Sequence, residues 1–271
     1  MKKSIILKDG GKPGKTLAVF AGIHGNEVVG IKTLDSIISK INISAGKVYF
    51  IYANPRAIKK NIRYIDSDLN RSFYGKVNKE SYETKRAKEL KKILNKCDAL
   101  LDLHAFRSSG IPFIICEKDS YKLASKLDFS IISSGWDNFD IGSVDGYMRS
   151  QGKQVICLEL GSIKKTKTYI PLAKKSILQF LKYYGVIDKN VQFSKNNKTF
   201  IKIYKRMFKS RDFAFTNSFS TGQLLPKRKI FAKDKTKKYI SKNEYIFFPD
   251  DTSKIGSEVC LLAKITRNTL G

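Results

Sequence analysis

Side chains that can bind a metal ion occur in this chain at positions that suggest hydrolytic chemistry. The 271 residues include two histidines, and each follows an apolar run: His24 in AVFAGIHGNE and His104 in ALLDLH. Glu27 comes three positions after His24. Imidazole nitrogen and carboxylate oxygen are the ligands that hold catalytic zinc, and three protein ligands leave a fourth position for water. We therefore predict that His24, Glu27 and His104 bind one Zn²⁺ per chain, as in a mononuclear zinc hydrolase.

The segment His24–Glu27 lies at a predicted strand-to-helix turn. Gly22 and Gly25 give the backbone of this turn the freedom that it needs. The imidazole and the carboxylate can then face one centre. The alternative is a helix cap by Asn26, with Glu27 placed favourably near the positive end of the helix. The segment alone leaves both interpretations open.

His104 ends its apolar run two residues after Asp102. Alternate residues of a strand point to the same side, so Asp102 and His104 are expected to share one face. A carboxylate beside a ligating histidine can fix the tautomer of the ring. The alternatives are a structural histidine and an aspartate that merely ends a strand.

Glu159 lies inside the apolar run Val155–Gly161. A carboxylate in such a strand is costly to bury unless it has a partner or a chemical task. Burial raises the pKa of a carboxyl group and a nearby zinc ion lowers it, which can adjust Glu159 for proton transfer. A structural ion pair is the alternative.

A polar, arginine-rich stretch over residues 54–74 shows no sustained periodicity and is predicted to be a long ordered loop. Loops of that length in compact domains are usually functional. A fixed cation such as Arg63 can stabilise the negative charge that develops on a carbonyl oxygen during amide hydrolysis. Asn70 and Arg71 offer donors for a substrate carboxylate. A basic, solvated loop is the alternative.

Apolar strands alternate with amphipathic helices as far as about residue 185. Strands are predicted over Thr16–Ala21, Lys47–Ala53, Ala99–His104, Pro112–Cys116, Phe129–Ser133 and Gln154–Leu160, and helices over Asn26–Lys40, Ser81–Lys96 and Tyr169–Tyr184. This alternation indicates an α/β fold with a mostly parallel or mixed sheet flanked by helices, in which ligands bind at the carboxyl ends of strands. His24, His104 and Glu159 all fall at or near such ends.

The pattern changes near residue 186, after which helical patterns are absent and strands are predicted over Thr199–Tyr204, Tyr245–Phe248 and Glu258–Ile265. We therefore predict two domains: a catalytic α/β domain over residues 1–185 and a small β-rich domain over residues 186–271.

The composition limits the class of protein. The formal charge is +28 and comes mostly from lysines spread along the chain. Charge without a cluster does not indicate a dedicated nucleic-acid-binding protein, and it favours an electrostatic field that attracts anionic substrates. No apolar run approaches the ~20 residues of a membrane span, and the start MKKSIILKDGG is too short in apolar residues for a signal peptide. The four cysteines are scattered, as expected of reduced thiols. We expect a cytoplasmic protein.

The motifs HGNE, NPRAIKKNIRYIDSDLNRSF, LDLH and CLELG, in this order over roughly residues 18–162, resemble the aspartoacylase/succinylglutamate desuccinylase family of zinc carboxypeptidase-like hydrolases. The resemblance implies zinc on His24, Glu27 and His104 and a small C-terminal β domain that narrows the entrance to the site. It also implies the further roles: Glu159 shuttles the proton of the attacking water, Arg63 stabilises the oxyanion, and Asn70, Arg71 and Arg149 bind substrate carboxylates.

The implied reaction is removal of an acyl group from a small, anionic N-acylated amino acid with a free carboxylate. The stretch Ala105–Ser109 departs from the Asn-Thr-Thr of aspartoacylases and is closer to desuccinylases. The motifs specify neither the acyl group nor the amino acid, and the sequence does not specify the oligomeric state. A metallocarboxypeptidase acting on peptides, including those derived from peptidoglycan, would use the same residues. A nucleic-acid-binding protein with a structural zinc site is the second alternative.

Overall fold

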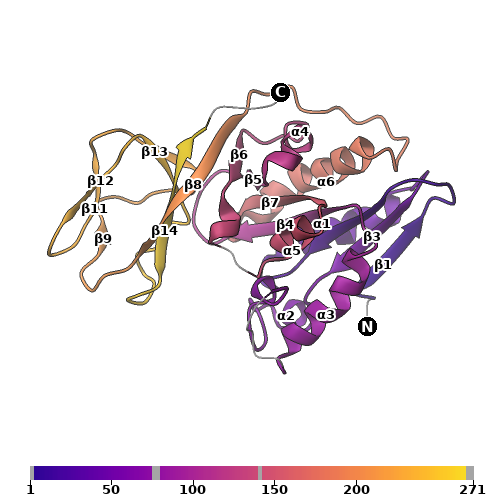
Figure 1. Cartoon of the computed structure of the whole chain (residues 1–271), viewed down its shortest axis with the longest axis horizontal. Helices are drawn as coiled ribbons and strands as arrows, with labels where there is room; N and C mark the ends of the chain where they lie inside the picture. The colour runs from indigo at the N-terminus through magenta and orange to yellow at the C-terminus, as the bar shows by residue number, and fades with distance from the viewer. Residues whose placement is uncertain (1–2, 75–79, 140–141, 267–271) are drawn as a thin grey trace.

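A large mixed sheet flanked by helices forms the body of the protein (Figure 1). The structure is a computed structural model that describes residues 3–74, 80–139 and 142–266. Within these residues, eleven strands are hydrogen-bonded in the order β1-β3-β2-β4-β7-β5-β6-β8-β14-β13-β10. The strands before residue 185 are β1 (Ile5–Asp9), β2 (Thr16–Ala21), β3 (Lys47–Tyr52), β4 (Ala99–Phe106), β5 (Phe113–Ile115), β6 (Ile131–Ser134) and β7 (Gln154–Ser162).

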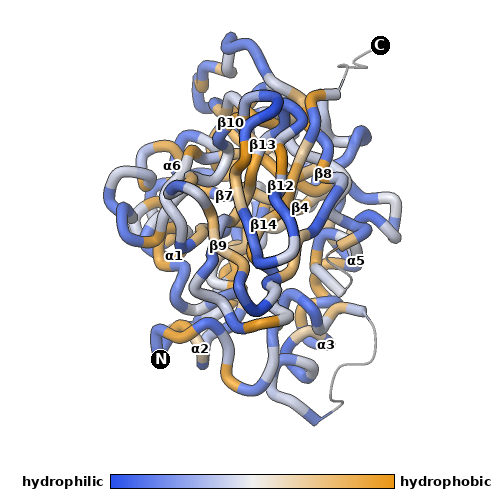
Figure 2. The backbone as a smooth tube through the Cα atoms, turned by 90° about the vertical axis from the view of Figure 1, so that its left-hand side faces the viewer, coloured by the Kyte–Doolittle hydropathy of each residue, from blue (hydrophilic) through white to orange (hydrophobic). Residues whose placement is uncertain are grey.

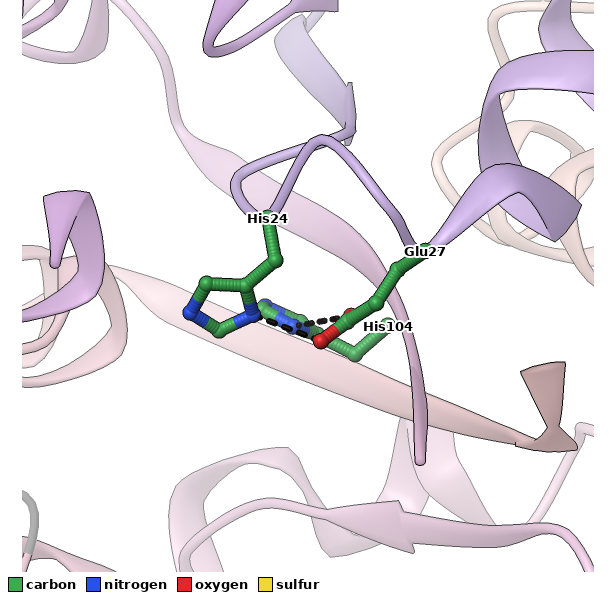
Figure 3. Close-up of side chains that lie close together, drawn as sticks. All are labelled: His24, Glu27 and His104. Carbon is green, nitrogen blue, oxygen red and sulfur yellow. Dashed lines mark hydrogen bonds and ion pairs between the residues drawn. The ribbon is translucent and has the colours of Figure 1, made fainter. Parts of the chain in front are cut away.

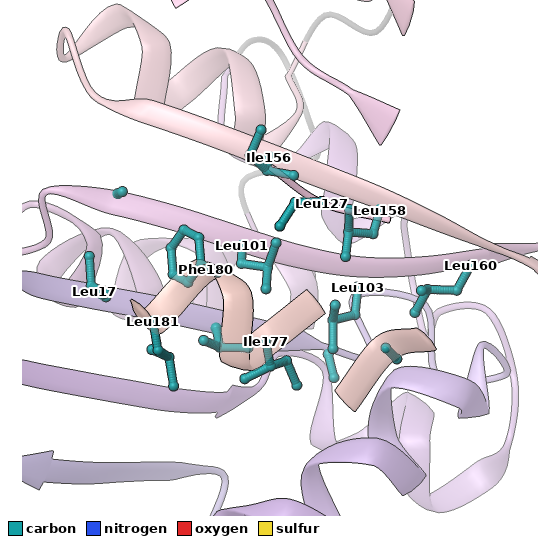
Figure 4. Packing of buried hydrophobic residues seen from close by; sticks show 14 of the residues in the cluster. Leu17, Leu101, Leu103, Leu127, Ile156, Leu158, Leu160, Ile177, Phe180 and Leu181 are labelled. Carbon is teal, nitrogen blue, oxygen red and sulfur yellow. The ribbon is translucent and has the colours of Figure 1, made fainter. Parts of the chain in front are cut away.

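Helices cover both faces of this sheet because its central strands, β3, β2, β4 and β7, are parallel and mostly apolar. The helices are α1 (Val28–Ile37), α2 (Pro55–Lys60), α3 (Tyr82–Leu94), α4 (Tyr121–Ala124), α5 (Val144–Ser150) and α6 (Thr166–Tyr183). Helices α1 and α6 belong to the core on one face, while α3 and α5 belong to the core on the other. Figure 4 shows Ile177 and Phe180 of α6 packed beside Leu101 and Leu103 of β4.

The predicted strands and long helices are found, with shifts at their ends. The helix expected over Asn26–Lys40 is α1 followed by a 3₁₀ turn at Ile38–Lys40, and the helix expected from Tyr169 begins at Thr166. The sequence analysis did not predict β1 or α5. Both are short, and neither carries a long periodic apolar pattern. No helix in the described part of the chain is long and apolar enough to span a membrane.

The described residues after 186 form strands without a helix, so the prediction of a C-terminal β region is confirmed. They are β8 (Thr199–Phe208), β9 (Ala214–Phe215), β10 (Gln223–Leu225), β11 (Ile230–Lys233), β12 (Lys238–Ile240), β13 (Glu244–Phe247) and β14 (Glu258–Ile265). Strand β8 pairs in parallel with β6, so the large sheet runs on through this region, while β12, β11 and β9 form a small separate sheet. Figure 2 faces these strands, with apolar stretches along β13 and polar loops around it.

The arginine-rich segment 54–74 is ordered, as predicted, but it contains α2 and a 3₁₀ turn at Leu69–Arg71. Its main anchor is Glu83 of α3, whose side chain is fully buried. The Glu83 carboxylate accepts hydrogen bonds from the backbone N–H groups of Ile65 (2.7 Å), Asp66 (3.1 Å) and Ser67 (3.2 Å) and from the Asn54 amide (3.2 Å). One carboxylate therefore fixes the middle of the segment.

Replacing Glu83 with glutamine should loosen this segment. Glutamine keeps only one acceptor oxygen for the four N–H donors, and its NH₂ group cannot accept a hydrogen bond from any of them. A buried donor without a partner costs about 1–3 kcal/mol. We expect a free energy of unfolding lower by that amount in urea, and faster tryptic cleavage after Lys59, Lys60 and Arg63. The control Glu80→Gln changes a side chain that is 83% exposed and should leave both measurements unchanged. Equal cleavage rates in the two variants would contradict this role of Glu83.

Candidate active site

Three side chains from separate elements converge where strands β2 and β4 end (Figure 3). His24 lies in the turn after β2, Glu27 immediately precedes α1, and His104 lies near the end of β4. The Nδ1 atom of His24 is 2.7 Å from Oε1 of Glu27, and Nδ1 of His104 is 3.1 Å from Oε2. One nitrogen or oxygen from each residue lies within 4.8 Å of the others. The predicted convergence of these three groups is thus found.

The turn that carries His24 depends on close backbone approach. A Cβ atom on Gly25 would lie 2.1 Å from the backbone carbon of Ala57 in α2, so only glycine fits there. Gly22 has φ +70°, which also favours glycine. The helix-cap alternative for Asn26 is not realised, because the N-cap of α1 is Glu27 and no side chain caps it.

Each imidazole uses its outer nitrogen to contact a further carboxylate. Nε2 of His104 lies 2.7 Å from Asp102, which confirms the predicted proximity of these two residues. Nε2 of His24 lies 3.0 Å from Asp68, a partner that the sequence analysis missed. The only available signal was the acidic residue in the DSDLNR segment, and nothing in its spacing linked it to His24. Both rings are thereby fixed with Nδ1 turned toward Glu27.

The charges of this cluster shift one another's ionisation. Burial alone would raise the pKa of Glu27, but His24 and His104 outweigh it and hold the pKa well below its usual range. Burial would likewise lower the pKa of His104, yet Asp102 and Glu27 raise it well above 6.5. Two imidazole nitrogens and a carboxylate, each oriented by a hydrogen bond, form a donor set that suits a divalent zinc ion.

Glu159 lies on β7 directly opposite His104 in the strand register. It is 9% exposed, and its Oε2 atom is buried without a hydrogen-bond partner among the described residues. Burial and the charge of Glu27 outweigh the opposing effects of His104, His24 and Arg63 and raise the pKa of Glu159 to about 8. The structural ion pair considered above is not found in the described part of the chain. Glu159 is thus a buried carboxyl group that holds its proton more tightly than an ordinary glutamate does.

The predicted arginines and asparagine lie around the same centre. Arg63 donates to Asp68 at 3.0 Å and has a nitrogen 3.5 Å from Glu27. The Asn70 side chain accepts from the backbone N–H of Val144, and Arg71 donates to the Asn70 carbonyl, both at 3.0 Å. Arg149 of α5 donates through Nε to Asp137 at 2.7 Å and through Nη2 to the other oxygen of the same carboxylate.

One cavity of about 690 Å³ contains all eight predicted site residues in its lining. The sequence analysis expected the C-terminal region to narrow the entrance but named no residue there. The structure places Arg206, Phe248, Pro249, Asp250, Thr252, Glu258 and Leu261 in the cavity wall. Further lining residues that were not predicted are Phe106, Arg107, Trp136, Asp145 and Lys164. These residues come from several strands, helix α5, 3₁₀ turns and loops that are far apart in the sequence, so a local pattern could not assign them to one cavity.

Comparisons with known proteins place this arrangement in a family. Residues 13–183 match the model of the succinylglutamate desuccinylase/aspartoacylase catalytic domain. The succinylglutamate desuccinylase of Pseudomonas aeruginosa is 39% identical over 85 residues, a match that covers 30% of this chain and only 26% of that protein. The Vibrio cholerae succinylglutamate desuccinylase is 25% identical over 278 residues, covering 92% of this chain and 80% of the relative.

A Xenopus tropicalis protein named N-acyl-aromatic-L-amino acid amidohydrolase (carboxylate-forming) is 31% identical over 168 residues, covering 54% of each chain. The crystal structure of a succinylglutamate desuccinylase/aspartoacylase from Rhodobacter sphaeroides has the same fold, with a TM-score of 0.80 at 16% identity, over 97% of this chain and 89% of that one. Because the family model matches more than half of the residues of this chain, the chain belongs to the succinylglutamate desuccinylase/aspartoacylase family.

Proposed function

We propose that the protein is a zinc-dependent amidohydrolase that removes the acyl group from a small N-acylated amino acid. The main support is the convergence of His24, Glu27 and His104 beside Glu159, whose buried Oε2 atom has no hydrogen-bond partner within the described residues. The relatives named as a succinylglutamate desuccinylase and an N-acyl-aromatic-amino-acid amidohydrolase support the same class of reaction.

The ligands would be Nδ1 of His24, Nδ1 of His104 and the Glu27 carboxylate. Zinc bound there would polarise the scissile carbonyl group and lower the pKa of a water molecule toward ~7. The remaining tasks fall to side chains of this chain. Glu159 accepts the proton of the attacking water and transfers it to the nitrogen of the departing amine as the C–N bond breaks.

Arg63 donates to the carbonyl oxygen as negative charge develops on it. Asn70 and Arg71 bind the free carboxylate of the amino acid and so fix the substrate relative to Glu159. The net charge of +28 attracts anionic substrates and makes their association rate depend on salt.

Glu159→Gln should retain zinc and lose most of its turnover. The amide has nearly the same shape but cannot accept the proton, so kcat should fall by about 10²–10⁴-fold. Steady-state kinetics together with the metal content of the purified variant test this. The exposed Glu80→Gln change serves as the matched control. A near-normal kcat would remove Glu159 from the proposed role.

Arg63→Ala should lower kcat by about 10²–10³-fold with a small effect on KM, because the lost interaction forms mainly in the transition state. The control is Arg56→Ala in the same segment, where Arg56 stacks on Tyr82 and does not line the cavity. A rise in KM with unchanged kcat would show that Arg63 anchors the substrate instead.

A substrate panel tests the reaction class. N-acyl amino acids and peptides that vary at the C-terminus are assayed before and after chelation and after zinc is returned. We expect chelator-sensitive release of free amino acid from the N-acyl compounds. Shortening of peptides from the C-terminus without deacylation would identify a metallocarboxypeptidase. Nucleic-acid binding that falls steeply with salt, without chelator-sensitive hydrolysis, would also refute the proposal.

A further inference from the structure

Helix α5 presents two ionisable side chains to the cavity. Asp145 and Arg149 are four residues apart, so they lie on one side of the helix, and both line the cavity. Asp145 is 7% exposed, and the Arg149 side chain is 10% exposed. Helix α5 packs against β7, the strand that carries Glu159. The pair therefore belongs to the wall of the proposed active site.

Each of these side chains has a buried polar atom that lacks a hydrogen-bond partner in the described part of the chain. The atoms are Oδ1 of Asp145, an acceptor, and Nη1 of Arg149, a donor. Burial raises the pKa of Asp145 to about 7, in keeping with a carboxyl group that no donor satisfies. Buried polar groups are normally paired, so an unpaired donor and acceptor in one cavity wall indicate a ligand with the complementary groups.

The charge of Arg149 is already compensated. Asp137 accepts from Nε and Nη2, which is a side-on pair that occupies one edge of the guanidinium group and leaves Nη1 on another edge. Asp145 adds a second acidic group near the same arginine. A second substrate carboxylate would bind Nη1 but would meet two acidic groups. An ammonium group would satisfy Asp145 but would meet the arginine.

We propose that this part of the cavity binds a neutral group that both donates and accepts hydrogen bonds, of which a carboxamide is the simplest, rather than a second carboxylate. The carbonyl oxygen would accept from Nη1 of Arg149, and the N–H would donate to Oδ1 of Asp145. The inference rests on the proposed deacylase function and gives Arg149 a different partner from the carboxylate that the family resemblance implied.

Two matched pairs of compounds test the proposal at either end of the substrate. N-acetyl-L-glutamine is compared with N-acetyl-L-glutamate, and N-succinamoyl-L-alanine with N-succinyl-L-alanine. Binding is measured by calorimetry on zinc-loaded Glu159→Gln protein, and hydrolysis on the wild type. In at least one of the two pairs, we expect the compound with the carboxamide to bind at least about tenfold more tightly than the matching compound with the carboxylate. Equal binding, preference for the carboxylate in both pairs, or no binding of any compound would overturn the inference.

Charge variants separate recognition from folding. For each pair, the dissociation constant of the carboxamide is divided by that of the carboxylate. Asp145→Asn in the Glu159→Gln background should raise this ratio about tenfold, in favour of the carboxylate. Asp137→Asn should shift it in the same direction at a position whose side chain is 42% exposed, where folding is less at risk. Asp188→Asn, an equal charge change on the surface outside the cavity lining, should leave the ratio unchanged. A ratio that moves in neither cavity variant would overturn the inference.

The two proposals can fail separately. If the Glu159→Gln protein prefers the amide but the wild type hydrolyses no N-acyl compound, the deacylase function is wrong and this binding preference stands. If the wild type hydrolyses N-acyl compounds but both carboxylates bind better, the function stands and this inference fails.

Discussion

The carboxylate of Glu27 is the interaction around which the site is organised. Its two oxygens contact the Nδ1 atoms of the two imidazoles. Its Oε2 atom also accepts a hydrogen bond from the backbone N–H of Ala105 at 2.9 Å. It thus connects the turn after β2 to the end of β4 through a group that is 5% exposed. A buried carboxylate persists only when such partners compensate its charge. The positions of both imidazoles follow from that requirement.

Charges of alternating sign extend outward from this centre. Asp68 and Asp102 orient the two imidazoles, and Arg63 lies between Asp68 and Glu27. Glu83 contacts none of these side chains, but it fixes the backbone from Ile65 to Ser67 that leads into Asp68. The geometry of the candidate metal-binding groups therefore depends on a carboxylate in α3 that does not line the cavity.

The sequence predicted those features whose cause is local. His24 and His104 follow apolar strands, and strand periodicity was enough to place Asp102 beside His104. The pairing of Asp68 with His24 and of Glu83 with segment 65–67 could not be predicted, because these contacts join an aperiodic segment to distant residues. Helix α5 has seven residues, too few for a periodic signal, so the surroundings of Arg149 were also missed. The wall formed by Arg206 and Phe248 depends on how β8, β14 and β13 add to the edge of the sheet, which no local pattern in the sequence specifies.

The parallel pairing of β6 with β8 has a consequence for access to the cavity. Leu261 on β14 and Glu159 on β7 both line the cavity, and their strands belong to one hydrogen-bonded sheet. A hinged lid at residue 186 would have to break the β6–β8 backbone hydrogen bonds at every opening. The part of the cavity wall that β8 and β14 form is therefore continuous with the rest of the sheet. Substitutions in β8–β14 can therefore change the shape of the cavity without altering the strands that carry His104 and Glu159.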